Sequence, residues 1–376
     1  MKKLLAFLVS CTCAICAVPQ VSAYADEPNL NGWLMWHSYT DYFALDSRLY
    51  VRDPDGEITE FTGDFKHAMN GDFGNSPEDV VFMAIDNDMD EWDIYLSKSG
   101  VITNLTENSG FRNEDPKFSP DGKTITFKRG FWSSQENDFV YNLAIFDLES
   151  GEITILTDDI YEEAMPYFSS DGKYIYYTDY TNNPGSIRRL KLEDNSTETV
   201  YAEPEVCAYY PIIMGQAVYF AKWYSTENHT DMILCLEDGE YTEMPFNSPD
   251  YNCSDPCPID ENEMIYSGSQ SGNYDLYYFD GEISQPIAGI NTDWNELGAA
   301  FFSCEEKTVL GDVNADGQFS IADVVLMQRW LLAVPDTELA DWQAGDLFAD
   351  GKLNAFDLCA MRKALVQSSV QNSSDN

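Results

Sequence analysis

The stretch NEDPKFSPDGKTITF at residues 113–127 is answered by EEAMPYFSSDGKYIYY at residues 162–177. Weaker copies follow, CAYYPIIMGQAVYF at 207–220 and CSDPCPIDENEMIYS at 253–267. The prolines that the copies share stand 50, 45 and 45 residues apart, at Pro116, Pro166, Pro211 and Pro256. This period is typical of a four-stranded propeller blade.

A second kind of segment alternates with these copies. Each one is a pair of short apolar runs, most of them separated by Asp-Gly or Ser-Gly, which predicts two half-buried strands joined by a tight turn. Five such segments occur: RLYVRDPDGEITEFT at 48–62, DIYLSKSGVITNLT at 93–106, LAIFDLESGEITILT at 143–157, MILCLEDGEYTEMPF at 232–246 and LYYFDGEISQPI at 276–287.

The two ends of the repeat region predict a closed ring of six blades. The first blade opens at GWLMWHS, residues 32–38, without an innermost strand, and NELGAAFFS at 295–303 is a first strand without a blade. If the late strand completes the early blade, no sheet edge stays open. The repeats carry the signatures PxFSPDGKxIxF and DIYxxDxxxG, and residues 26–303 therefore resemble the TolB-like six-bladed β-propeller family. This resemblance is specific for fold and says little about activity.

After a linker at residues 304–310 the pattern changes. GDVNADGQFSIADVVLMQRWLL at 311–332 is repeated 34 residues later as GDLFADGKLNAFDLCAMRKALV at 345–366. The first copy places oxygen ligands at positions 1, 3, 5, 7 and 12 of a loop that leads into a helix, and the second copy does so at all of these positions except position 3, which is the spacing of an EF-hand calcium site. The expected ligands are Asp312, Asn314, Asp316, Gln318 and Asp323 in the first loop, and Asp346, Asp350, Lys352 and Asp357 in the second, with Gln318 and Lys352 acting through their backbone carbonyls.

The second loop departs from this pattern at one position. Position 3 is Phe348, which has no side-chain oxygen to offer a cation. We therefore expect weaker calcium binding in the second loop. Behind the loops, two apolar stripes at helical spacing are expected to pack on each other: Val324, Met327 and Leu331, and Leu358, Met361 and Leu365.

Residues 311–366 resemble type I dockerins. That resemblance implies a small all-α module with two calcium ions and a partner, the cohesin domain of a scaffoldin, in an extracellular cellulosome. The family's recognition positions fall here on Ile321, Ala322, Gln328 and Arg329, and on Ala355, Phe356, Arg362 and Lys363. The two sets differ from each other, which argues against two equivalent docking orientations. Residues 367–376 are expected to form a disordered tail.

The N-terminus predicts secretion. Residues 1–25 have the charged start, apolar stretch and Ala23-Tyr24-Ala25 cleavage site of a signal peptide, although Leu8-Val9-Ser10-Cys11 also permits a lipid anchor. The formal net charge of −44 argues against nucleic acid and anionic membranes as partners. Six cysteines follow the signal peptide without the spacing of a disulfide framework, so buried free thiols are expected.

The function of the propeller is left open between two hypotheses. Tryptophans in the expected hairpin loops are candidate stacking platforms for a plant cell-wall polysaccharide, namely Trp36, Trp92, Trp132 and Trp223. His37 is the candidate catalytic base. The propeller is then either a hydrolase or lyase in polysaccharide catabolism, or a non-catalytic platform for glycan or protein.

Overall fold

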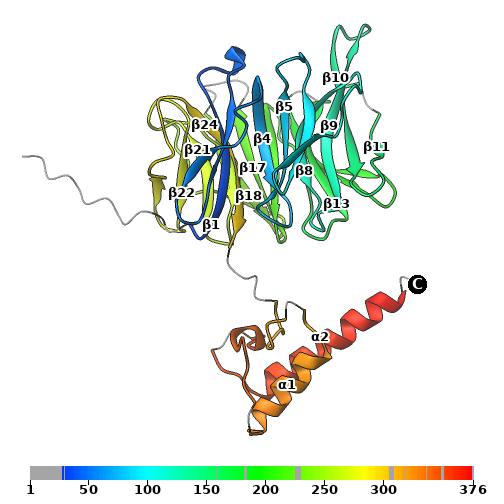
Figure 1. The fold of residues 1–376 in the computed structure, drawn as a ribbon, viewed down its shortest axis with the longest axis vertical. Helices are drawn as coiled ribbons and strands as arrows, with labels where there is room; N and C mark the ends of the chain where they lie inside the picture. The colour runs from blue at the N-terminus through cyan, green and yellow to red at the C-terminus, as the bar shows by residue number, and fades with distance from the viewer. Residues whose placement is uncertain are drawn as a thin grey trace, which may run out of the picture. The chain divides into compact units, whose positions relative to one another are not determined.

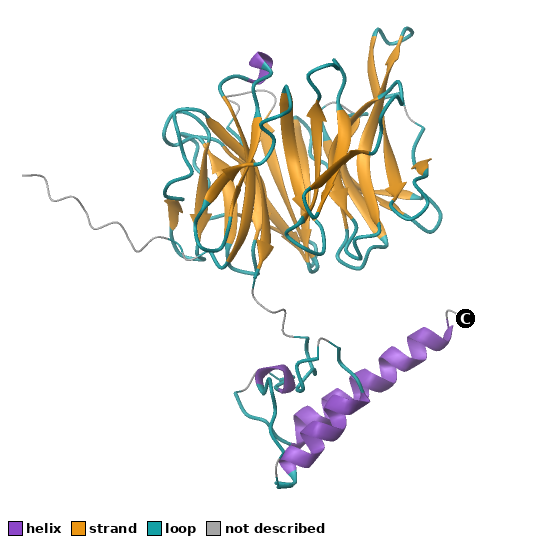
Figure 2. Cartoon of the chain, in the orientation of Figure 1, coloured by secondary structure: helices purple, strands orange, loops and turns teal. Residues whose placement is uncertain are grey.

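The computed structural model describes residues 28, 30–158, 160–181, 184–224, 230–304, 309–316, 318–335, 337–348 and 351–374, with side chains of the last helix to residue 366. The expected signal peptide, Gly317 and Asp350 lie outside the described residues. The chain divides into two compact units, residues 1–302 and 303–376. Figures 1 and 2 show that strands build the first unit and that both long helices belong to the second.

The first unit consists of six four-stranded antiparallel sheets. Blade 1 is β24 (Asn295–Ser303), β1 (Gly32–Tyr39), β2 (Arg48–Arg52) and β3 (Ile58–Glu60), and a short 3-10 helix, η1 (Tyr42–Ala44), follows β1. Blade 2 is β4 (His67–Phe73), β5 (Asp79–Ile85), β6 (Asp93–Lys98) and β7 (Val101–Asn104). Blade 3 is β8 (Arg112–Phe118), β9 (Thr124–Ser133), β10 (Asp138–Asp147) and β11 (Ile153–Ile155).

The remaining blades follow in chain order. Blade 4 is β12 (Glu163–Phe168), β13 (Tyr174–Asp179), β14 (Ser186–Lys191) and β15 (Thr197–Tyr201). Blade 5 is β16 (Val206–Met214), β17 (Ala217–Tyr224), β18 (Met232–Glu237) and β19 (Glu240–Glu243). Blade 6 is β20 (Cys253–Pro258), β21 (Met264–Gly268), β22 (Asp275–Phe279) and β23 (Ser284–Pro286). The six-bladed fold is therefore confirmed, and so is the closure of blade 1 by β24.

Apolar clusters between adjacent blades hold the ring together. One of them joins blade 1 to blade 6 and includes Leu34, Trp36, Ile265 and Ala299. A polar contact repeated in five blades adds to this packing. In each, a backbone N–H donates to a threonine hydroxyl or an asparagine side-chain oxygen, 2.8–3.0 Å away, in the segment that leaves the blade. The donors are Leu49, Ile94, Leu143, Ile233 and Leu276. Because these five N–H groups have a partner, the five strands are buried at this point without an unsatisfied backbone donor.

Each of the six innermost strands contains one residue with positive φ, and these residues are Asn70, Asp115, Met165, Tyr210, Asp255 and Gly298. In five of the strands the pairing register shifts at this point, which marks a β-bulge. The repeated prolines of the sequence directly follow four of the bulge residues. A proline suits a bulge because it has no backbone N–H to leave unpaired where the ladder is interrupted.

The second unit contains α1 (Ile321–Leu331), the 3-10 helix η2 (Gln343–Gly345) and α2 (Ala355–Ser374). The two expected apolar stripes meet in one core, in which Val324, Met327, Leu358 and Met361 are buried. Helix α2 continues to Ser374, whereas a disordered tail is expected from residue 367. Residues 367–374 contain no proline or glycine, so nothing in them interrupts the helical hydrogen bonds.

The cysteines agree only in part with the expectation of buried thiols. All six of those after residue 25 are free, and Cys207, Cys253 and Cys257 are buried, but Cys304 and Cys359 are exposed. Among the described residues, no helix combines the length and apolar character that crossing a bilayer requires.

Candidate functional site

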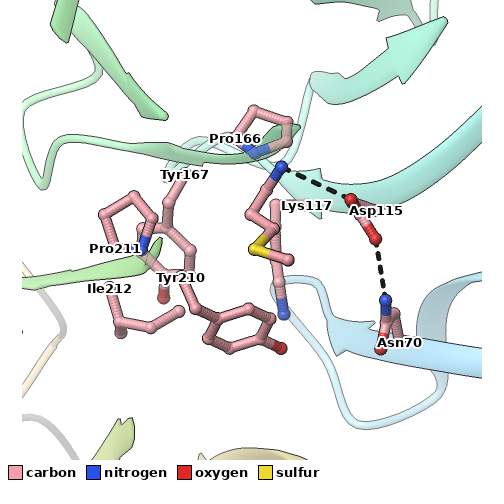
Figure 3. Close-up of a pocket in the computed structure, with 9 residues that line it drawn as sticks. Asn70, Asp115, Lys117, Pro166, Tyr167, Tyr210, Pro211 and Ile212 are labelled. Atoms are coloured by element: carbon pink, nitrogen blue, oxygen red, sulfur yellow. Dashed lines mark hydrogen bonds between the residues drawn. The ribbon is translucent and has the colours of Figure 1, made fainter. Parts of the chain in front are cut away.

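A small cavity lies at the centre of the propeller, between the innermost strands of blades 2 to 5. Figure 3 shows Asn70, Asp115 and Tyr210, three of the bulge residues, around a cavity of about 10 Å³. Asn70 Nδ2 donates to Asp115 Oδ1 at 2.8 Å, and the backbone N–H of Met165 donates to Asp115 Oδ2 at 3.3 Å. A space of this volume holds about one water molecule. This cavity therefore has no room for a sugar ring.

Charged groups beside the cavity are paired. Lys128 Nζ lies 3.2 Å from Glu114, 3.5 Å from Asp115 and 3.0 Å from Glu162. Burial opposes the charge of Lys128, but the three carboxylates prevail and hold its pKa well above the ordinary value. On another innermost strand, burial raises the pKa of Asp255 to about 6, against a hydrogen bond from the backbone N–H of Gly298 at 3.1 Å.

His37 is a neutral, buried side chain. Burial is the main reason that its pKa falls to about 3, and the nearby His67 and Lys117 lower it further. Its Nδ1 atom has no hydrogen-bond partner among the described residues, and its ring packs against Gly298, where a Cβ atom would come within 2.5 Å of Cε1. A base works best with a pKa near the operating pH. The position of His37 therefore gives little support to the predicted catalytic role.

The four candidate tryptophans do not form a common face. Trp36 is 2% exposed and belongs to the core between blades 1 and 6, and Trp92 is buried beside His67 with ring centroids 4.6 Å apart. Trp132 is 55% exposed on the β9–β10 hairpin, where it packs edge-on against Phe139. Trp223 is half-buried near the end of β17. Trp36 and Trp92 thus serve mainly as core residues.

A groove that the sequence analysis missed lies where blades 1 and 6 meet. It has a volume of about 450 Å³, and its lining includes Trp36, Tyr50, Ile58, Asp293, Trp294 and Glu296. We call it the closure groove. Its only sequence signal is the run DWNE at residues 293–296, which stands directly before the late strand of blade 1.

The first acidic loop of the second unit is organised by its own carboxylates. Asp323 is fully buried and accepts hydrogen bonds from the backbone N–H groups of Asn314, at 3.2 Å, and Ser320, at 2.8 Å. Asp312 Oδ1 accepts from the backbone N–H of Asp316 at 3.1 Å, and Asp316 Oδ1 accepts from that of Gln318 at 3.1 Å. The predicted ligands of the first loop therefore share one tight turn.

The second loop shows a buried oxygen that lacks a partner. Asp357 is fully buried; its Oδ2 atom accepts from the backbone N–H of Asn354 at 2.9 Å, and its Oδ1 atom has no hydrogen-bond partner among the described residues. Asp346 Oδ2 accepts from the backbone N–H of Gly351 at 2.6 Å. Phe348 is exposed and contributes no oxygen.

The donor set of these loops fits calcium. The ion prefers carboxylate, amide and carbonyl oxygens, and a cation would supply the missing partner of Asp357 Oδ1. In the described part of the chain, no three Asp, Glu, His or Cys side chains already converge on one point. The oxygens of the first loop accept hydrogen bonds from within the loop instead. Asn314 Nδ2, for example, donates to Asp316 Oδ2 at 2.9 Å.

Comparison with curated proteins gives two partial matches. An uncharacterized peptidase, YuxL, of Bacillus subtilis (strain 168) is 37% identical over 108 residues, 28% of this chain and 16% of that protein. The uncharacterized protein Atu1656 of Agrobacterium fabrum is 28% identical over 174 residues, 44% of this chain and 56% of that protein. The chain thus spans less than two thirds of the length of either relative.

Solved structures share the propeller fold. TolB from Acinetobacter baumannii superposes with a TM-score of 0.58 at 14% identity, over 73% of this chain and 67% of TolB. Hydrazine synthase of Kuenenia stuttgartiensis superposes with a TM-score of 0.60 at 13% identity, over 72% of this chain and 46% of the hydrazine synthase chain. Residues 310–366 match the family model of the dockerin type I domain. The chain therefore carries a dockerin type I domain at residues 310–366, preceded by a six-bladed β-propeller with TolB-like structural neighbours.

Proposed function

We propose that this protein is a secreted cellulosome component, which its dockerin attaches to the cohesin domain of a scaffoldin when calcium is bound. One observation carries the proposal. All eight side chains at the family's recognition positions are exposed, whereas the stripes behind them are buried or half-buried: the exposed set is Ile321, Ala322, Gln328, Arg329, Ala355, Phe356, Arg362 and Lys363. The helices thus present these positions to a partner and use their other faces for the core.

Two apolar side chains are the best candidate anchors for the cohesin. Ile321 is 63% exposed and Phe356 is 75% exposed. Large apolar groups at this exposure contribute most when a partner covers them, because their burial removes apolar surface from water. They occupy different positions in the two copies of the repeat, since the equivalent of Ile321 is Ala355. We therefore propose one preferred docking orientation rather than two equal ones.

Calcium would be held by Asp312, Asn314, Asp316, Asp323 and the Gln318 carbonyl in the first loop. In the second loop it would be held by Asp346, Asp350, the Lys352 carbonyl and Asp357. The bound ion supplies positive charge against carboxylates that otherwise repel one another. We propose two ions, with weaker binding in the second loop because Phe348 has no oxygen.

Docking can be tested with the full chain and a panel of purified type I cohesin domains, by calorimetric titration. We expect at least one cohesin to bind in calcium and to dissociate in EDTA. Phe356→Ala should weaken that binding tenfold or more. Val366→Ala is the matched control, because Val366 is an exposed apolar residue of the same helix outside the recognition positions. If no cohesin in the panel binds the calcium-loaded chain, the proposed attachment is wrong.

For the propeller we propose a binding role in plant polysaccharide catabolism rather than a hydrolase or lyase activity. Two features support this choice. The candidate base His37 is buried with a pKa near 3, and the central cavity has room for one water molecule only. Gels of xylan or glucomannan should retard the chain in electrophoresis, and incubation with these polysaccharides or with pectin should release neither reducing ends nor unsaturated products. Release of either product would favour the catalytic hypothesis instead.

A further inference from the structure

The closure groove brings exposed aromatic rings and carboxylates together. Trp294 is 40% exposed, and Tyr50 and Ile58 complete the apolar side. Behind them the ring of Trp36 stacks on that of Tyr50, with centroids 5.7 Å apart and planes inclined by 22°. Trp36 therefore supports Tyr50 from within the core, and the exposed faces are those of Tyr50 and Trp294.

Carboxylates form the polar side of the groove. Glu296 is fully buried, and its Oε1 atom accepts hydrogen bonds from the hydroxyls of Ser38, at 2.9 Å, and Thr292, at 2.7 Å. Its Oε2 atom accepts from the backbone N–H of Thr292 at 3.3 Å. Asp293 is an exposed acceptor nearby. Among the described residues that line the groove, none is Lys, Arg or His.

The segment that carries Asp293 and Trp294 is held in place from both blades. On the side of blade 6, Asn273 Nδ2 donates to the carbonyl of Thr292 at 3.1 Å and also to that of Trp294. On the side of blade 1, Asn295 Nδ2 donates to the carbonyl of Thr40 at 3.3 Å. Because these contacts lie within the protein itself, little order has to be gained on binding.

The chemistry of the groove restricts its ligand. A ligand needs an apolar face for the two aromatic rings and hydrogen-bond donors for the carboxylates, and it must lack negative charge, since no cation lines the groove. A pyranose ring has C–H faces and hydroxyl donors. The volume of about 450 Å³ lies within the range of roughly 300–1,000 Å³ that is usual for small-molecule sites.

We propose that the closure groove binds a neutral pyranose residue of a glycan chain, stacked on Trp294 and Tyr50 and hydrogen-bonded to Asp293, with the buried Glu296 holding Thr292 in place behind them. This inference rests on the proposed binding role of the propeller and gives it a site and a ligand class. A uronic acid does not fit, because its carboxylate would face two others. A quaternary ammonium fits less well, because it has no hydrogen-bond donors and because Trp36 and Tyr50 stack on each other instead of enclosing a space.

The test uses the full chain in calcium, titrated with cellohexaose, xylohexaose, mannohexaose and hexagalacturonate by calorimetry. At least one neutral hexasaccharide should bind, and hexagalacturonate should not. Trp294→Ala should weaken the binding of the neutral sugar tenfold or more. Trp342→Ala is the matched control, since it removes a similarly exposed tryptophan from the dockerin and should change affinity less than twofold. Melting temperatures of both variants should stay close to that of the unaltered chain.

Three results would overturn the proposal. If none of the neutral sugars binds, the propeller has no such ligand, and the proposed binding role in polysaccharide catabolism also fails. If a neutral sugar binds but Trp294→Ala has no effect, the binding role stands and the closure groove is the wrong site. If hexagalacturonate binds as tightly as the neutral sugars, the assignment of ligand class is wrong. Cohesin docking is measured separately and is unaffected by any of these outcomes.

Discussion

Arg362 donates a hydrogen bond from its guanidinium to Gln328 Oε1, at 2.6 Å, and so links helix α2 to helix α1. The two residues occupy the same position in the two copies of the dockerin repeat, 34 residues apart. Recognition positions of both copies therefore adjoin each other on one surface. Arg362 has a partner within the domain, whereas its exposed neighbour Lys363 forms no ion pair with the described residues.

This pairing separates the effects of two adjacent substitutions. Arg362→Ala should lower the melting temperature of the dockerin slightly, because an exposed hydrogen bond of this kind contributes about 1 kcal/mol. It should weaken cohesin binding less than Lys363→Ala does, since Lys363 is free to reach a partner. Calorimetric titration and thermal denaturation of both variants measure the two effects. A larger loss of docking for Arg362→Ala than for Lys363→Ala would contradict this assignment.

Removal of calcium should unfold the dockerin and leave the propeller folded. The buried carboxylates of Asp323 and Asp357 lie in a small core that cannot offset their repulsion and desolvation without a cation. Scanning calorimetry of the full chain should show two transitions in calcium, of which only the dockerin transition is lost in EDTA. A dockerin transition that keeps its temperature in EDTA would show that the fold does not depend on the ion.

Phe348→Asn should strengthen calcium binding in the second loop, because the amide oxygen supplies the missing ligand at position 3. Calorimetric titration with calcium should show one binding step shifted about tenfold and the other unchanged. Phe356→Asn provides the control, since it places the same side chain on the first turn of α2, outside the expected ligand set. An equal shift in both variants would point to a general effect of the lost phenylalanine.

Asp255→Asn should stabilise the propeller at neutral pH. The folded-state pKa of Asp255 is raised from 3.8 to about 6, mainly by burial. A carboxyl group with a raised pKa in the folded state contributes its full stabilisation of the fold below pH 3.8, and this stabilisation is lost as the pH rises through 6. The asparagine variant lacks this loss and keeps an oxygen for the N–H of Gly298. Its advantage should be absent at pH 4 and reach at most about 3 kcal/mol at pH 7.5.

Denaturant unfolding of both chains at the two pH values measures this difference. A smaller gain is expected if channel water solvates the carboxylate, because Asp255 is only half-buried. A variant that is less stable than the unaltered chain at pH 7.5 would show that the hydrogen bonds to the ionised carboxylate outweigh its burial.

Strand β24 should be essential to the ring. A chain that ends after Cys304 keeps β24, whereas a chain that ends after Thr292 exposes the edge of β1 and uncovers the cores around Ala299 and Ala300. The shorter chain should melt about 10 °C lower or more, as expected for a loss of several kcal/mol. It should also aggregate in sedimentation experiments. Equal melting temperatures would contradict the closure.

The order of the blades could be predicted from the sequence because its signals are local. Alternating apolar residues, Asp-Gly turns and the repeated prolines each act over a few residues, and their period gave the number of blades. The strand at residues 295–303 was recognised as the partner of β1 because it was left over from the count. In the dockerin, the spacing of Asp312, Asn314, Asp316 and Asp323 directly reflects the geometry of one loop, so the expected calcium ligands could be named as well.

The tertiary structure alone decided which aromatic and titratable side chains face solvent. Trp36 lies in β1 and Trp294 stands directly before β24, two strands of the same blade, yet one is buried and the other exposed, because burial depends on how neighbouring blades pack. His37 became a neutral core residue for the same reason. The closure groove combines residues 36–58 with residues 289–296, which are brought together only when the ring closes, and no local pattern in the sequence records that contact.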